Sequence, residues 1–465
     1  MDGYEKGAPA GRATTESILC RPVDAAGLAA FRIGFGVLLA AGTIRFMAEG
    51  WVDVLFVEPS FFFRYYGFDW VPVPGPVLLH VLYGALCFLG IAFAAGIYFR
   101  YVALLLFVGF SWVELVDVSN YLNHYYLVSL LLFLSIFLPI GSTWSLDARF
   151  RQGFFRETVP AWVLYLFRFQ VAVVYFFAGL AKLGADWLLY AQPLGIWLAA
   201  RDEMPVIGGL FGLPWVPYLA SWAGFVFDTS IVPLLLWQRT RAIAFLAVLA
   251  FHFGTHLLFD IGLFPFLMPL LATLFFSPDW PRRVLARFGK RGSGAPVPSR
   301  PYEVPSLAKR RMVTAAVGAY VAFQLILPLR SFVYGGDVLW HEQGMRWSWR
   351  VMVREKNGSI VYRVRNPETG REWQVGPMRY LTWRQANEMT GQPDLILKLA
   401  HHIAEDFRER GPVEVRVDAL VSLNGRPAAR LIDPNADLAR VSDGIAPASW
   451  ILPRGGTPPF SIAGS

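Results

Sequence analysis

The stretch YFFAGLAKLGADW, residues 175–187, places Lys182 at the end of a long apolar run. Apolar surroundings disfavour the charged form of a lysine, because burial removes the water that stabilises an ammonium group. A neutral amine at pH 7 is a base, and it can remove the proton of a weak acid such as a phenol or a quinol. The residue types alone do not identify the acid that the lysine would deprotonate. The structural alternative is a lysine whose ammonium reaches the membrane surface from a helix end.

Other polar residues also interrupt apolar runs. A polar or ionisable group inside a membrane span is costly, so each is a candidate functional residue. The candidates are Asn123, His124, Arg168, Gln170, Asp228, His252, His256 and Asp260. Most of them fall in the half of their predicted span that is nearer the outer face. This placement predicts one polar site that is open both to lipid and to the outer compartment.

Each candidate also has a purely structural explanation. His124 can donate to a backbone carbonyl at the membrane surface, and Asp228 can pair with Arg168 or with a helix-end amide. His252 and His256 are four residues apart and share one helical face, which is a spacing that suits a metal ion. No third ligand is evident in the sequence, so we predict no metal site.

Apolar helices must position these residues. The chain has 465 residues, of which 55% are apolar and only 16% are charged, whereas soluble domains carry about 25% charged residues. Several apolar runs approach or exceed the roughly 18 residues that span a bilayer. The sequence therefore predicts a polytopic α-helical membrane protein with about nine transmembrane helices. The predicted spans are 27–46, 76–97, 101–118, 125–140, 162–182, 217–237, 242–259, 263–276 and 312–329.

Basic residues concentrate in alternate loops, which predicts the orientation. The tail, the 141–161 loop and the 277–311 loop are rich in Lys and Arg, whereas the intervening loops contain only Arg64 and Arg201. By the positive-inside rule, the N-terminus is cytoplasmic and the chain after residue 330 is extracytoplasmic. The net charge of +8 is thus a topology signal rather than a nucleic-acid site. We expect an integral membrane protein, with a bacterial inner membrane as its location.

Turn motifs and charged residues return in the last third of the chain. We expect KNG (356–358) to join WSWRVMV to SIVYRVR as antiparallel strands, and NPETG (366–370) to lead into a further strand. Residues 393–410 have the apolar spacing of a helix, and 413–425 alternate as a strand before an Asn-Gly turn. This pattern predicts an α+β domain.

The predicted organisation therefore has three parts. They are a cytoplasmic tail (1–26), a transmembrane helical domain that holds the site (27–330) and an extracytoplasmic α+β domain (331–465). The chain has no GxxxxGK[ST] motif, no GxGxxG after a strand and no HExxH. Cys20 and Cys87 form no CxxC pair, which argues against dithiol redox chemistry.

Five segments carry a resemblance to a known family. They are NHYYLVSLLLF (123–133), YFFAGLAKLGADW (175–187), LFFSPDWPRRV (274–284), WSWRVMV (347–353) and VSLNGRPAARLIDP (421–434). These segments resemble vitamin K-dependent γ-glutamyl carboxylase and its bacterial relatives, within the wider family that has a horizontally transferred transmembrane domain. The last two segments matter most, because simpler members of the wider family lack the carboxylase-like outer domain.

The resemblance implies an activity. In that family the lysine of FAG-x-x-KL deprotonates vitamin K hydroquinone, and oxygenation of the quinol to its epoxide generates a strong base. That base removes a γ-proton from a protein glutamate, and CO2 adds to the carbanion. Lys182 matches the catalytic lysine, and Asn123 and His124 match a pair in the same site. We also expect Gln170 and His256 to contact the quinol, which is vitamin K hydroquinone or menaquinol.

The substrate side departs from the family pattern. Arg430 matches the arginine that contacts the glutamate, and Trp349 lies in the segment that lines the glutamate site. Arg354 stands where the family has a histidine, Met345 replaces a tyrosine, and Ala181 replaces the first of two lysines. We retain Arg354 as a predicted substrate contact, and we expect a separate reductase to regenerate the quinol. The alternatives are a quinol epoxidase without carboxylation and a non-enzymatic membrane scaffold or transport-related protein.

Overall fold

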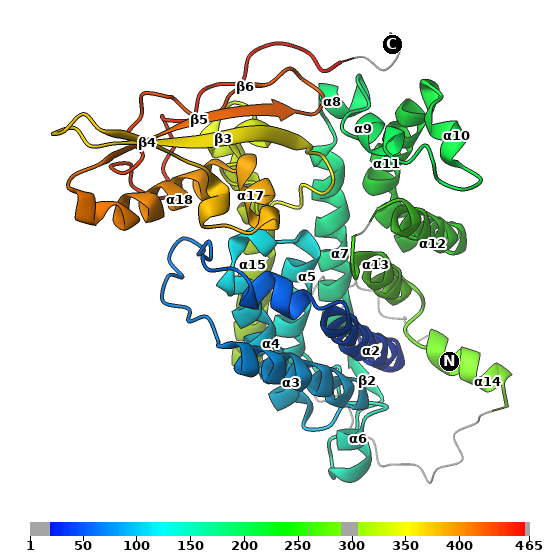
Figure 1. Ribbon diagram of the computed structural model, residues 1–465. Helices are drawn as coiled ribbons and strands as arrows, with labels where there is room; N and C mark the ends of the chain where they lie inside the picture. Colours follow the sequence, from blue (N-terminus) through cyan, green and yellow to red (C-terminus); the bar gives the residue numbers. More distant parts are fainter. Residues whose placement is uncertain (1–18, 260, 290–305, 461–465) are drawn as a thin grey trace, which may run out of the picture.

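The computed structural model of the chain describes residues 19–259, 261–289 and 306–460, so much of the predicted cytoplasmic tail lies outside it. Within these residues, seven helices are long and apolar enough to cross a membrane. They are α2 (Ala26–Ala48), α3 (Pro76–Ala95), α4 (Phe99–Val116), α7 (Ala161–Ala181), α11 (Trp215–Leu236), α12 (Arg241–Leu258) and α15 (Leu307–Leu329). The helical region lies below an α+β domain (Figure 1). The polytopic fold with a C-terminal α+β domain is therefore confirmed.

The predicted count of about nine spans is not confirmed. The two remaining predicted spans correspond to α5 (Asn123–Phe137) and to α13 (Phe264–Ala272) followed by the 3-10 turn η3 (Thr273–Phe275). A 15-residue helix such as α5 covers roughly 22 Å, which is less than the roughly 30 Å of a bilayer core. About half of the α5 residues are buried inside the protein, and they contribute to the core of the helical region.

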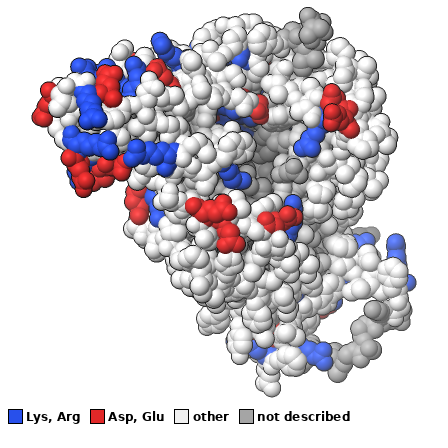
Figure 2. Space-filling model, viewed as in Figure 1, with Lys and Arg blue, Asp and Glu red and all other residues white. Residues whose placement is uncertain are grey.

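Helix α7 occupies the centre of the helical region. It packs against α11, α13 and α15, and 67% of its most apolar 18-residue window is buried, the largest share among the seven long helices of the described chain. On the face that Figure 2 shows, the flank of the helical region is almost free of charge, whereas charged residues gather on the C-terminal domain. An uncharged flank is what contact with lipid requires. At the C-terminal end of α7, Ala178, Gly179 and the capping Lys182 are buried inside the protein.

The C-terminal domain is a four-stranded antiparallel sheet with the order β4-β3-β5-β6. Its strands are β3 (Lys356–Arg365), β4 (Glu372–Val375), β5 (Glu414–Leu423) and β6 (Ala429–Arg430), and its main helices are α17 (Trp383–Thr390) and α18 (Pro393–Asp406). The core between sheet and helices also contains Phe63 and Val118, which belong to loops of the helical region. The two regions therefore share a hydrophobic core.

Several local predictions are confirmed. NPETG joins β3 to β4, and the Asn366 side chain accepts hydrogen bonds from the backbone N–H groups of Glu368 and Thr369. Helix α18 lies within the predicted helix, and β5 ends at Leu423 before Asn424 and Gly425, which both have positive φ. Positive φ at both residues is the geometry that an Asn-Gly turn favours.

The predicted hairpin at KNG is wrong. Lys356 to Gly358 lie inside β3, which pairs with β5 from Lys356↔Leu423 to Arg365↔Glu414. A Cβ at Gly358 would lie 2.2 Å from the carbonyl oxygen of Leu420, so this glycine permits close strand pairing rather than a turn. The segment 347–353 forms no strand, and three of its residues, Trp347, Trp349 and Met352, have positive φ.

Short elements complete the described fold. They are β1 (Pro22–Asp24) paired with β2 (Thr158–Pro160), the helices α6 (Leu146–Phe150), α8 (Ala185–Leu188), α9 (Leu194–Ala199), α10 (Gly208–Phe211), α14 (Trp280–Arg287) and α16 (Val338–His341), the π-turn η1 (Asp53–Val57) and the 3-10 turns η2 (Val118–Asn120), η4 (Arg330–Tyr334), η5 (Pro377–Arg379) and η6 (Arg408–Arg410).

Candidate functional site

Lys182 caps the C-terminal end of α7 and forms a buried ion pair. Its Nζ donates a hydrogen bond of 2.7 Å to Oδ2 of Asp228 on α11, and each side chain is 6% exposed. It also lies within 3.5 Å of the carbonyl oxygens of Ala178 and Val351. The ammonium therefore does not reach the membrane surface. Asp228 pairs with this lysine rather than with Arg168, which donates to two backbone carbonyls near the end of α13.

The ion pair lines a cavity of about 300 Å³. Its walls come from α7, α11 and α12, and most of the lining side chains are apolar. A second polar pair, Tyr175 and His252, also lines it, with the tyrosine hydroxyl 2.8 Å from Nε2 of the histidine. His252 is 1% exposed, and its Nδ1 has no hydrogen-bond partner among the described residues. The cavity thus has two polar pairs in otherwise apolar surroundings.

The segment 349–353 covers the cavity from the side of the C-terminal domain. Val351 and Met352 line the cavity, and Trp349 is fully buried among the helices, where it stacks on Tyr126 with ring centroids 5.0 Å apart. The Nζ of Lys182 also lies 5.0 Å from the centre of the Trp187 ring. The segment 349–353, which forms neither helix nor strand, therefore covers Lys182. We call this segment the roof.

An interdomain pair holds this roof. Arg426 donates two hydrogen bonds to the carboxylate of Asp186, the residue before Trp187. Asn424 donates to the same carboxylate at 3.0 Å and to the carbonyl of Val353 at 3.2 Å. The ADW motif of the helical region and the NGR motif of the C-terminal domain are thereby joined beside the cavity.

Asn123 and His124 lie at the edge of this arrangement. Asn123 Nδ2 is 3.5 Å from the carbonyl of Arg350, the neighbour of the carbonyl that Lys182 contacts. His124 is 7% exposed and packs beside the ring of Phe264, which lines the cavity. Its Nε2 has no hydrogen-bond partner within the described chain. These two residues therefore lie near the cavity without lining it.

Three other predicted residues lie away from the cavity wall. Gln170 accepts a hydrogen bond of 2.6 Å from the Tyr320 hydroxyl, which joins α7 to α15. His256 is exposed and packs against Phe266, so His252, one turn earlier, faces the cavity instead. Arg430 is exposed on β6. Asp260 lies outside the described residues.

Sequence reasoning missed Tyr175 and Asp186 as parts of the site. Both belong to the quoted stretch that contains Lys182. Tyr175 is seven residues before the lysine, which places both on one helical face, and this spacing was the available signal. No comparable signal links Asp186 to Arg426, because the two are 240 residues apart.

Two family models match the chain. The model of the HTTM domain matches residues 20–280, which is more than half of the chain, and the model of the vitamin K-dependent gamma-carboxylase lumenal domain matches residues 309–456. The chain belongs to the vitamin K-dependent gamma-carboxylase family. No solved structure matches it. In this family member, the cavity lies where the two matched regions meet, since Lys182 belongs to the first and Val351 to the second.

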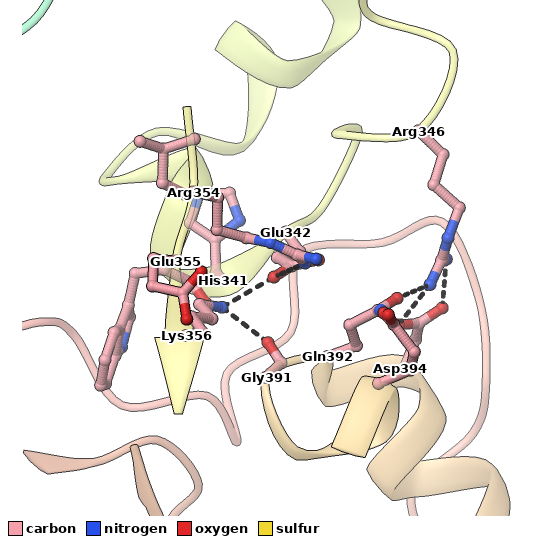
Figure 3. A network of polar contacts seen from close by, with 12 residues as sticks. His341, Glu342, Arg346, Arg354, Glu355, Lys356, Gly391, Gln392 and Asp394 are labelled. Carbon is pink, nitrogen blue, oxygen red and sulfur yellow. Dashed lines mark hydrogen bonds and ion pairs between the residues drawn. The ribbon is translucent and has the colours of Figure 1, made fainter. Parts of the chain in front are cut away.

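In this carboxylase-family chain, Arg354 belongs to a buried charge network of the C-terminal domain (Figure 3). Arg354 and Lys356 both donate to the carboxylate of Glu342, and Lys356 also donates to the carbonyl of Gly391 at 2.6 Å. Burial would raise the pKa of Glu342, but the two cations hold that pKa below its ordinary value. The charge of Arg354 is therefore paired inside the domain.

Lys356 gives this network a pH dependence. Burial lowers the pKa of Lys356 to about 8, against 10.5 for a free lysine. Between about pH 8 and pH 10.5, this lysine is mostly neutral in the folded chain and mostly protonated in the unfolded chain. The free energy of unfolding therefore rises with pH in this range. Relative to Lys356→Met, we expect a gain of roughly 1.5 kcal/mol between about pH 8 and 9.5. Denaturant unfolding at several pH values measures this gain, and equal slopes in both proteins would contradict it.

Proposed function

We propose that this chain is an integral membrane γ-glutamyl carboxylase that uses a reduced naphthoquinone, O2 and CO2. The net reaction converts quinol, O2, CO2 and a protein glutamate into quinone epoxide, water and γ-carboxyglutamate. One oxygen atom of O2 enters the epoxide and the other leaves as water, while the glutamate exchanges a γ-proton for CO2. The supporting observation is the buried Lys182–Asp228 pair on the wall of an apolar cavity.

The cavity suits a quinol in size and in chemistry. Its volume of about 300 Å³ lies at the lower end of the range for small-molecule sites. A hydroquinone has hydroxyl groups on opposite sides of an apolar ring, and the cavity has two polar pairs in apolar walls. Lys182 with Asp228 would hold one hydroxyl, and Tyr175 with His252 would hold the other. When bound, the quinol supplies, through its oxygenation, the strong base that a γ-proton requires.

The base in this proposal is the Lys182–Asp228 pair rather than an isolated neutral amine. The pair carries no net charge when the lysine is protonated and the aspartate is ionised. If Lys182 passes its proton to the carboxylate of Asp228 and takes the proton of a bound hydroxyl, the pair gains one positive charge beside the oxygen that has lost the proton. Opposite charges formed together in apolar surroundings stabilise each other strongly. The roof of residues 349–353 would keep water away from this step.

A second candidate function is a quinol epoxidase without carboxylation. The pairing of Arg354 with Glu342 favours it, because that charge is then not free for a glutamate substrate. In both candidates the C-terminal domain is extracytoplasmic, and a separate reductase regenerates the quinol. The two differ in whether a glutamyl peptide is required.

Oxygen uptake tests the quinol chemistry that both candidates share. Purified protein in lipid nanodiscs receives a reduced naphthoquinone in an oxygen-electrode cell, with a glutamate-containing peptide and bicarbonate present. We expect enzyme-dependent oxygen uptake together with epoxide formation. The oxidised quinone serves as the control and should give neither. Oxygen uptake no faster than in protein-free nanodiscs would contradict both candidates and favour the scaffold.

A further inference from the structure

Five of the cavity-lining residues on α11 and α12 are small. Ala220, Ala223 and Gly224 on α11 and Ala250 and Gly254 on α12 all line the cavity. Elsewhere these helices expose large apolar side chains. On α11 these are Leu219, Trp222 and Val226, and on α12 they are Leu246, Leu249, Phe253 and Leu257. Where the two helices border the cavity, small side chains therefore separate the cavity from the lipid-facing surface.

An aromatic pair joins α11 to α12 beside these small residues. Phe227 of α11 stacks on Phe251 of α12 with ring centroids 3.9 Å apart and an interplanar angle of 13°. The two helices are consecutive and antiparallel, so Ala223 and Gly254 each lie about one turn nearer the C-terminal domain than the stacked rings. Ala223 and Ala250 are exposed at the surface and also line the cavity. The cavity thus reaches the surface of these two helices beside the stacked rings.

The chemistry of the cavity and of the gap indicates which kind of ligand could extend from the cavity into lipid. The unpartnered Nδ1 of buried His252 calls for a polar group inside the cavity. The gap itself presents only small apolar residues toward lipid. A molecule that satisfies both has a polar head and a long apolar tail.

We propose that the gap between Ala223 and Gly254 is a lateral portal through which the prenyl tail of the quinone leaves the cavity into the lipid. This inference rests on the proposed quinol function and adds the residues that admit the tail. Small residues are needed there because a larger side chain would fill the path that the tail takes. Because the polar pairs hold the head group, the portal should affect binding according to the length of the tail and not according to the chemistry of the ring.

Gly254 is the position at which to test the portal. A Cβ built there meets no heavy atom within 4 Å, so a side chain can be added at this position without a clash at its first atom. Gly224 is less suitable, because its Cβ would lie 3.5 Å from the Trp187 ring beside Lys182. Gly84 on α3 provides the matched control, since it is exposed and also has nothing within 4 Å of a Cβ.

The experiment measures binding without turnover. Oxidised naphthoquinones with one prenyl unit or with a long polyprenyl tail are titrated into wild type, Gly254→Leu and Gly84→Leu in nanodiscs. Quenching of tryptophan fluorescence reports binding, because Trp187 lines the cavity. We expect Gly254→Leu to weaken long-tail binding at least about tenfold relative to short-tail binding. Gly84→Leu should match the wild type for both.

The possible outcomes distinguish a failure of the portal proposal from a failure of the proposed quinol function. Equal weakening of both quinones in Gly254→Leu would place the glycine against the head group and overturn the portal. Unchanged binding of both would mean that the tail leaves elsewhere, which also overturns it. Failure of the wild type to bind either quinone would contradict the proposed quinol function itself, and the portal with it.

Discussion

Replacing Lys182 by alanine should lower quinol-dependent oxygen uptake by about 10²- to 10⁴-fold, the usual contribution of a positioned acid–base group. The substitution removes the donor that lies 2.7 Å from Asp228 and leaves no amine beside the bound hydroxyl. The control is Lys309→Ala, which removes an exposed lysine near the start of α15 and should leave the rate unchanged. Oxygen uptake within threefold of wild type in Lys182→Ala would contradict the role of this lysine.

Loss of activity must be separated from loss of structure. Lys182→Ala alone leaves the buried Asp228 without its cation, which typically costs about 3–5 kcal/mol. The double variant Lys182→Ala/Asp228→Asn removes both charges and should recover much of the lost stability. We expect it to unfold near the wild-type temperature yet remain inactive. If activity returned together with stability, the ion pair would be structural rather than catalytic.

Replacing Arg426 by alanine should lower the stability of the protein substantially. Its guanidinium is 8% exposed and pairs with an Asp186 side chain that is 16% exposed, so removal leaves a partly buried carboxylate with only the hydrogen bond from Asn424. Breaking a fully buried pair from one side costs about 3–5 kcal/mol, and we expect a loss at the lower end of this range. Thermal unfolding of the purified protein in detergent measures this effect. Arg430→Ala, four residues along the chain, is the matched control and should stay within about 0.5 kcal/mol.

The same two variants test how the domains support the site. Asp186 precedes Trp187, and Asn424 ties Asp186 to the roof residue Val353. Arg426→Ala should therefore also increase solvent access to the cavity, seen as a red shift of tryptophan fluorescence. A shift of equal size in Arg430→Ala would show that the pair does not hold the roof.

The sequence predicted the features that depend on local patterns. Apolar runs located the helices. The apolar stretch that ends at Lys182 indicated a candidate site because a lysine there is costly, and Lys182 lines a cavity. NPETG and Asn424–Gly425 predicted their turns because those residues favour the required backbone geometry. The KNG prediction failed because a glycine also permits close strand pairing, and β5, the partner of β3, begins at Glu414, far along the chain.

Features that join distant segments could not be predicted. Lys182 and Asp228 are 46 residues apart on different helices, and nothing in either segment specifies the partner. The roof is equally hidden, because positive φ at Trp347, Trp349 and Met352 is a conformation that sequence patterns do not indicate. His252 rather than His256 faces the cavity, since the rotation of α12 is set by its packing against α11 and α13.

The most direct test measures epoxide and fixed label in one sample. Purified wild type and Lys182→Ala receive reduced naphthoquinone, O2 and labelled bicarbonate, with and without a glutamate-containing peptide. For the wild type with peptide we expect epoxide and γ-carboxyglutamate label in equal amounts, and for Lys182→Ala neither. Epoxide formed at the full rate without peptide and without fixed label would contradict carboxylation and leave the epoxidase. Both products formed at the wild-type rate by Lys182→Ala would contradict the central role of the buried lysine.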